Sequence, residues 1–112
     1  MRIGRLTAVT GVRRRALRYY EEQGLLVAGR SGNGYREYAE DAPVTVGQIT
    51  ALLDSGLNSE AIRRFLPCAR GVLPEFDMCD DLRAHLERRL RELDEQRVKL
   101  ERQLGRISAH LG

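Results

Sequence analysis

The stretch RRRALRYYEEQGLL, residues 13–26, places four arginines and two adjacent tyrosines in its first eight positions. It contains no proline, and its only glycine is Gly24, which stands where a left-handed helix C-cap favours glycine. The stretch therefore predicts a short helix from about Arg13 to Gln23.

The arginines of this predicted helix share one face. Arg14 and Arg18 are one turn apart, and Arg15 lies three residues before Arg18, spacings at which helical side chains are neighbours. Arginine suits DNA because its guanidinium clamps phosphates and reads guanine through two parallel hydrogen bonds. A solvated surface helix could carry the same charge, so the flanking sequence has to decide. Leu17 is assigned to the core.

Charge is unevenly distributed along the chain. The 112 residues have a net charge of +3, but residues 1–38 contain eight arginines and three glutamates, a net charge of +5. Residues 39–81 contain three arginines and eight acidic residues, a net charge of −5. Positive charge concentrated at one end is typical of a surface that binds a large anion, and nucleic acid is the commonest such partner.

The segment before the basic helix completes a motif. Ile3, Leu6 and Val9 recur every three residues and predict a helix that Gly11 ends. Two short helices joined by a glycine-containing turn form a helix-turn-helix.

A hairpin is predicted directly after this motif. Asn33 and Gly34 indicate a two-residue type I′ turn, because that turn needs positive φ at both central positions. The flanking residues 26–27 and 35–38 are apolar or aromatic enough to form short strands. Such a hairpin is a wing, and it brings Arg30 and Arg36 toward the surface of the basic helix.

Two more helices follow the wing. Asp41 is expected to cap a helix over residues 42–55, and Asn58 to cap a fourth helix, in which Leu57 and Ile62 are placed for a hydrophobic staple. Pro67 ends that helix.

The last third of the chain predicts one long helix with a coiled-coil seam. About 34 residues at 1.5 Å each give a length near 50 Å. An intramolecular partner is the other interpretation, but no second long helix exists in the chain, so we expect homodimerisation. Arg97 occupies one seam position, where it is expected to lower stability and help to fix register and orientation. The seam residues alternate at spacings of four and three and are Leu86, Leu90, Leu93, Arg97, Leu100, Leu104, Ile107 and Leu111.

The expected fold is therefore mainly α with a small β-hairpin wing, in three regions. Residues 1–66 form a winged helix-turn-helix DNA-binding domain with a second helix pair, residues 67–77 a connector, and residues 78–112 a coiled-coil dimerisation helix. No stretch has the length of a membrane span or the apolar core of a signal peptide, so we expect no membrane partner and a cytoplasmic location.

These segments resemble the MerR family of transcriptional regulators. IGRLTAVTGV, ALRYYEEQGLL and NGYREY stand in that family's order and spacing. The resemblance covers residues 3–66 closely and the long helix in architecture. It implies an antiparallel coiled-coil homodimer that binds double-stranded DNA at a dyad-symmetric promoter operator. It also implies that the dimer distorts the DNA so that RNA polymerase engages both promoter elements.

The resemblance also implies site residues. Arg18 and Tyr19 match family positions expected on the DNA backbone, and Arg36 and Tyr38 match the wing's phosphate clamps. The complete set of candidate DNA-binding residues is Arg14, Arg15, Arg18, Tyr19, Tyr20, Arg30, Tyr35, Arg36 and Tyr38.

Some positions leave alternatives open or depart from the family. Tyr20 and Tyr35 suit either DNA contact or packing of the helix and wing. Arg13 stands where the family usually has a serine or threonine that caps the recognition helix. Pro43 replaces an expected apolar residue of the third helix.

Cys68 and Cys79 have three interpretations: inert apolar filler, a redox pair, or metal ligands. Two cysteines are too few for a tetrahedral zinc site. Cys79 matches a ligand position of some metal-sensing family members, but the usual partner ligands are missing. A disulfide would need the connector to fold back at Gly71 and Pro74. The chain stops at Gly112 with no room for a drug-binding domain, and we expect no metal and no cofactor.

The predicted function is that of a sequence-specific transcriptional regulator, with a redox response through Cys68 and Cys79 as one hypothesis. The alternative is an architectural or recombination accessory protein that bends DNA without an effector. An enzyme is not expected, because neither histidine has a plausible nucleophile partner and no carboxylate pair converges on an apolar pocket.

Overall fold

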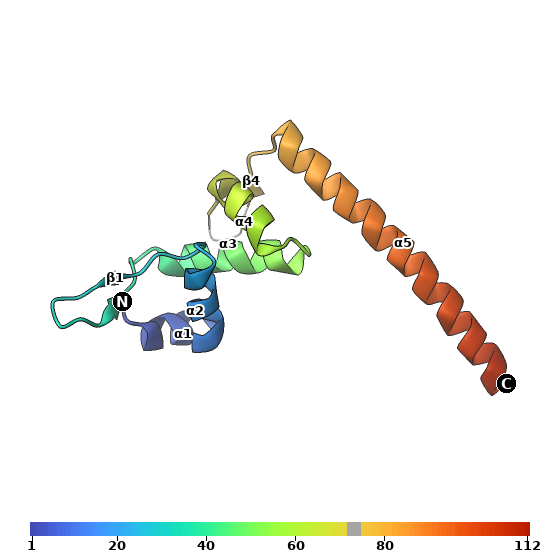
Figure 1. Cartoon of the computed structure of the whole chain (residues 1–112), viewed down its shortest axis with the longest axis horizontal. Helices are drawn as coiled ribbons and strands as arrows, with labels where there is room; N and C mark the ends of the chain where they lie inside the picture. Colours follow the sequence, from blue (N-terminus) through green and yellow to red (C-terminus); the bar gives the residue numbers. More distant parts are fainter. Residues whose placement is uncertain (72–74) are drawn as a thin grey trace. The chain divides into compact units, whose positions relative to one another are not determined.

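The computed structural model describes residues 1–71 and 75–112, and its described residues are mainly helical (Figure 1). The chain divides into two compact units, residues 1–77 and 78–112. A mainly helical fold with a small hairpin wing and a long C-terminal helix was predicted, and the prediction is confirmed. The elements in order are α1 (Ile3–Thr10), α2 (Arg14–Glu22), β1 (Gly29–Arg30), β2 (Arg36–Glu37), α3 (Ala42–Asp54), α4 (Ser59–Phe65), the 3₁₀ turn η1 (Leu66–Cys68), β3 (Ala69–Arg70), β4 (Glu75–Phe76) and α5 (Asp80–Leu111).

The helix-turn-helix is formed by α1 and α2. Gly11 has a φ of 73°, and its N–H donates to the Thr7 carbonyl, which closes α1. Gly24, with a φ of 72°, follows α2 as predicted, and the N–H of Leu25 donates to the Tyr20 carbonyl at 2.9 Å. This hydrogen bond is typical of a helix that ends at a residue in the left-handed conformation.

The core of the first unit lies among α1, α2, α3 and α4. Packing joins α1 to both α2 and α3, and α3 to α4. Leu6, Leu17, Ile49 and Ile62 are completely buried. Val9 is 59% exposed. Of the apolar residues that recur every three positions along α1, it therefore lies outside the core.

The wing forms with a different turn from the predicted one. β1 and β2 are antiparallel, with Arg30 opposite Arg36, which leaves five residues in the loop. A loop of that length cannot be a two-residue type I′ turn. The N–H of Gly34 donates to the Ser31 carbonyl at 2.9 Å, and Gly34 has a φ of 80° whereas Asn33 does not have a positive φ. The type I′ prediction is therefore wrong, although the hairpin itself is present.

The first predicted strand, residues 26–27, was placed too far from this turn, whereas the second, residues 35–38, contains β2. Leu26 lies in the core at 4% exposure, because the end of α2 turns it inward, and pairing starts only at Gly29.

The two predicted caps of the second helix pair have different outcomes. Asp41 precedes α3 but makes no side-chain capping bond, because its ψ of 1° is far from the extended conformation of an N-cap. Pro43 fits the first turn of α3, where no N–H is needed. Asn58 caps α4 as predicted: its Oδ1 accepts from the N–H of Ala61 at 2.9 Å.

The connector contains structure that the sequence did not predict. After η1, strands β3 and β4 pair antiparallel, and the N–H of Asp77 donates to the Cys68 carbonyl at 2.9 Å. Arg70 Nη2 lies 2.9 Å from Asp77 Oδ1. Pro74, which the predicted fold-back of the connector would use, lies outside the described residues.

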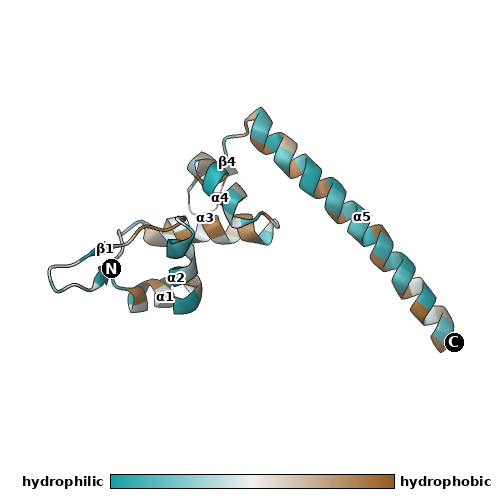
Figure 2. Ribbon diagram, viewed as in Figure 1, coloured by the Kyte–Doolittle hydropathy of each residue, from teal (hydrophilic) through white to brown (hydrophobic). Residues whose placement is uncertain are grey.

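The second unit is the single helix α5, 32 residues long. Cys79 caps it: the Cys79 Sγ accepts from the N–H of Leu82 at 3.4 Å. Apolar residues recur along this otherwise hydrophilic helix (Figure 2). From Leu90 to Leu111 the apolar seam residues are 42–84% exposed. None of the described helices is long and apolar enough to cross a membrane.

Candidate nucleic-acid interface

The orientation of α2 is set by its two buried side chains. Leu17 is completely buried and Tyr20 is 6% exposed. Because successive helical residues rotate by about 100°, burial of these two turns Arg14, Arg15 and Arg18 outward, and all three are exposed. With Tyr19 and Glu22 they line a shallow, open concavity.

Tyr19 stands at the edge of this basic face. Its ring is 46% exposed, and its hydroxyl lies 3.2 Å from the Ser59 Oγ at the start of α4. On the same side, Arg63 of α4 donates from Nε to the Gln23 carbonyl at 2.9 Å. The helix α4 therefore supports both the aromatic edge and the C-terminal end of α2.

A second open groove lies between α2 and the wing. Arg18 and Glu21 line it from α2, and Arg30 and Arg36 line it from the wing. The Nε of Arg36 lies 3.5 Å from the Glu21 Oε2. This ion pair joins the wing to α2, and Arg18 and Arg36 line the same groove. The basic groups of the two elements therefore face one continuous surface.

The wing tip carries its own fixed geometry. Arg30 donates from Nη1 to the Gly34 carbonyl at 2.9 Å, which braces the loop. Tyr35 is 58% exposed, and the guanidinium carbon of Arg2 lies 4.5 Å from its ring centroid, a cation–π contact.

Arg2 and Glu21 are residues that sequence reasoning missed. Arg2 reaches the wing because the N–H of Tyr38 donates to the Met1 carbonyl at 2.7 Å, a pairing between distant segments that no local pattern reveals. The sequence patterns assign no role to Glu21, because its partner Arg36 lies fifteen residues further along the chain.

Two of the nine candidate residues are buried. Tyr20 packs inside α2, and Tyr38 is only 3% exposed. Burial and the neighbouring Glu21 carboxylate raise the pKa of Tyr38, so its phenol keeps its proton. Packing explains both rings, and DNA contact by any of the nine residues stays a prediction.

The residue at the N-cap of α2 does not cap the helix with its side chain. Arg13 occupies the N-cap with extended backbone angles and makes no side-chain capping bond. The first N–H groups of a helix carry partial positive charge. An arginine there adds to that charge, so the start of α2 suits an anion better than it suits Arg13 alone.

The two cysteines are free thiols, one in each unit. Cys68 is half-buried at the end of η1, and Cys79 is exposed at the N-cap of α5. Among the residues that the structure describes, no three His, Cys, Asp or Glu side chains gather in a group that could hold a metal ion.

Comparison with known proteins places this arrangement in a family. The profile of the MerR helix-turn-helix family of regulatory proteins matches residues 1–67. The transcriptional regulator HmrR of Rhizobium leguminosarum bv. viciae is 30% identical over 105 residues, which cover 90% of this chain and 81% of HmrR. The nodulation protein NolA of Bradyrhizobium elkanii is 39% identical over 88 residues, 78% of this chain. The match spans only 37% of NolA's own length.

A solved structure has the same fold. HiNmlR, a MerR family regulator lacking the sensor domain and crystallised with promoter DNA, aligns with a TM-score of 0.60 at 22% identity. The alignment covers 93% of this chain and 77% of HiNmlR. From the family profile over residues 1–67 and the match to HmrR, the chain belongs to the MerR helix-turn-helix family.

Proposed function

We propose that this protein binds a dyad-symmetric promoter operator as a homodimer and distorts the DNA to control transcription initiation by RNA polymerase. The observation that carries the proposal is the continuous basic surface formed by α2 and the wing. On it, the Glu21–Arg36 ion pair joins the wing to α2. HiNmlR, which shares the fold, was crystallised on promoter DNA, and this supports the same partner here.

Each element of the surface has a role that its geometry suits. The exposed face of α2 fits the major groove, where Arg14, Arg15 and Arg18 reach base edges and phosphates. Arg36, held beside α2, and Arg30, braced on its own loop, take phosphates on the flank. Preorganised side chains lose less entropy on binding, so the braces raise affinity without touching the DNA.

The exposed seam of α5 supports a homodimer. Fully burying a Leu or Ile side chain contributes about 1.5–3 kcal/mol, and six large apolar side chains of this seam are exposed in the single chain. A second copy offers the same seam. Two DNA-binding units related by a two-fold axis require an operator with matching symmetry.

The second candidate function is an architectural DNA-bending protein without an effector. Such a protein would use the same basic surface of α2 and the wing, but it would not need two copies of that surface at a fixed separation. The long exposed seam of α5 favours the dimeric regulator, because a monomer that bends DNA gains nothing from it.

Replacing a single arginine of this surface should weaken DNA binding and its dependence on salt. Arg18→Ala and Arg36→Ala should each make the negative slope of log K against log salt shallower by about 0.9, the loss of one phosphate contact. Fluorescence anisotropy on duplexes selected from a random pool measures this. Arg102→Ala on α5 is the matched control and should leave the slope unchanged. Equal slopes for all four proteins would contradict the proposed surface.

DNA should tighten the start of α2. A phosphate at the uncapped N-terminus relieves the repulsion from Arg13, so the amides of Arg14 to Ala16 should exchange more slowly on a bound duplex. Hydrogen exchange with and without the duplex tests this. The start of α4, which Asn58 already caps, is the internal control. Identical exchange at residues 14–16 in both states would reject this prediction.

We also propose that Cys68 and Cys79 respond to oxidants. Two thiols and one hydrogen peroxide would give one disulfide and two waters. The bond would withdraw the Cys79 sulfur that now accepts from the N–H of Leu82, and thereby perturb the start of α5.

The redox proposal predicts an intramolecular Cys68–Cys79 disulfide after mild peroxide treatment, together with a change in DNA affinity. Peptide mass mapping under non-reducing conditions detects the bond. Cys68→Ser should abolish both effects while leaving the Cys79 cap in place. Two free thiols after oxidation would remove the proposal and leave the DNA-binding function intact.

A further inference from the structure

The seam of α5 matches itself in one antiparallel register. In heptad terms, positions 90, 97, 104 and 111 are a positions, and positions 86, 93, 100 and 107 are d positions. Antiparallel pairs place an a residue opposite a d residue of the other chain. Pairing 86 with 111, 90 with 107, 93 with 104 and 97 with 100 matches all eight seam positions, and each pair of numbers adds to 197. A slip of one heptad leaves two positions of each chain unpaired.

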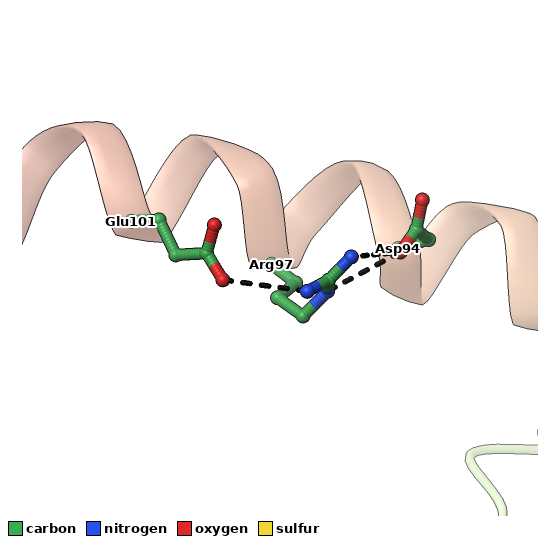
Figure 3. Close-up of polar contacts among 3 residues, drawn as sticks. All are labelled: Asp94, Arg97 and Glu101. Carbon is green, nitrogen blue, oxygen red and sulfur yellow. Dashed lines mark hydrogen bonds and ion pairs between the residues drawn. The ribbon is translucent and has the colours of Figure 1, made fainter.

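Arg97 lies near the centre of this seam within an ion-pair cluster (Figure 3). Its Nη2 is 2.7 Å from Asp94 Oδ1, and its Nη1 is 3.4 Å from Glu101 Oε1. The same Asp94 oxygen accepts from the Arg97 Nε at 3.2 Å. All three side chains are 61–64% exposed, so the cluster is open to a partner.

Asp94 and Glu101 occupy e positions, which flank the a positions on the helix surface. In an antiparallel pair the e and a positions of both chains line the same edge. In the register above, each residue lies at the height of 197 minus its own number on the other helix. Glu101 of the partner subunit then lies at height 96, one residue from Arg97. The two Arg97 side chains lie three residues apart, about 4.5 Å along the axis.

We propose that two copies pair in this register, with both Arg97 side chains and the four Asp94 and Glu101 carboxylates forming one ion-pair cluster across the two-fold axis. The proposal rests on the proposed homodimer. Along the shared edge the charges run two negative, two positive, two negative. Each Arg97 keeps Asp94 of its own chain and gains a carboxylate of the other chain.

The cluster selects orientation as well as register. A parallel pair places residues of the same number in one layer, so the two Arg97 guanidinium groups would meet directly in the seam. The antiparallel pair offsets them and sets Leu100 of the partner subunit opposite each Arg97. The like-charge contact destabilises the parallel alternative, in the way that a polar seam residue selects one pairing over others.

Spin-label distances between the two copies test the register. The full-length chain carries Cys68→Ser and Cys79→Ser, the second of which keeps a capping side chain, and a nitroxide label on Arg88→Cys. Arg88 pairs with position 109, a separation of 21 residues, or about 31 Å along the axis. A slip of one heptad changes this separation by about 10 Å. We expect one interchain distance of 30–40 Å, about the axial separation plus a lateral offset.

Two variants of the labelled chain test whether Arg97 selects the antiparallel orientation. Arg97→Leu should add a second population with a short distance, about the width of a two-helix pair, because the parallel arrangement is no longer penalised. Arg102→Leu, on the outer face of the same helix, should keep the single distance. A single unchanged distance for Arg97→Leu would overturn the role of Arg97.

The outcomes separate this inference from the proposed function. Sedimentation of the same labelled protein reports the oligomeric state. A dimer with a short or slipped distance overturns the register and leaves the dimeric regulator standing. A monomer overturns both the register and the homodimer.

Discussion

The burial of Leu17 and Tyr20 determines which face of α2 is exposed. These two side chains fix the rotation of α2 about its own axis, and every other side chain of the helix follows from that rotation. The arginines then face outward as a group, and Glu21 lies where Arg36 of the wing can reach it. Packing in the core thus sets the direction of the arginine side chains, because it fixes the rotation of α2.

Sequence reasoning found the features that depend on local spacing. The basic face of α2, the glycine that ends it, the Asn58 cap and the long seam of α5 follow from residues within a few turns of one another. The sequence was weaker where distant segments decide. The burial of Tyr38, for example, depends on the pairing of the wing with Met1, which no short sequence pattern predicts. Asp41 has the right residue type for a cap and the wrong backbone angles.

Two misses have a common physical cause. The type I′ turn was inferred from Asn33 and Gly34 alone, but the register of Arg30 opposite Arg36 sets the loop length. The contact of Arg2 with Tyr35 likewise depends on how the N-terminal residues lie along the wing. Register and chain path are properties of the folded unit, so short sequence patterns do not contain them.

In the proposed function, the first unit presents an oriented basic surface, and the seam of α5 pairs two copies of that surface about a two-fold axis. The most direct test is the symmetry of the DNA that the reduced protein selects from a random pool, followed by hydroxyl-radical footprinting of the selected duplex. A dimeric regulator should select an inverted repeat with two protected half-sites and altered cleavage at the centre. Direct repeats, or selection without any motif, would contradict it and favour the architectural function.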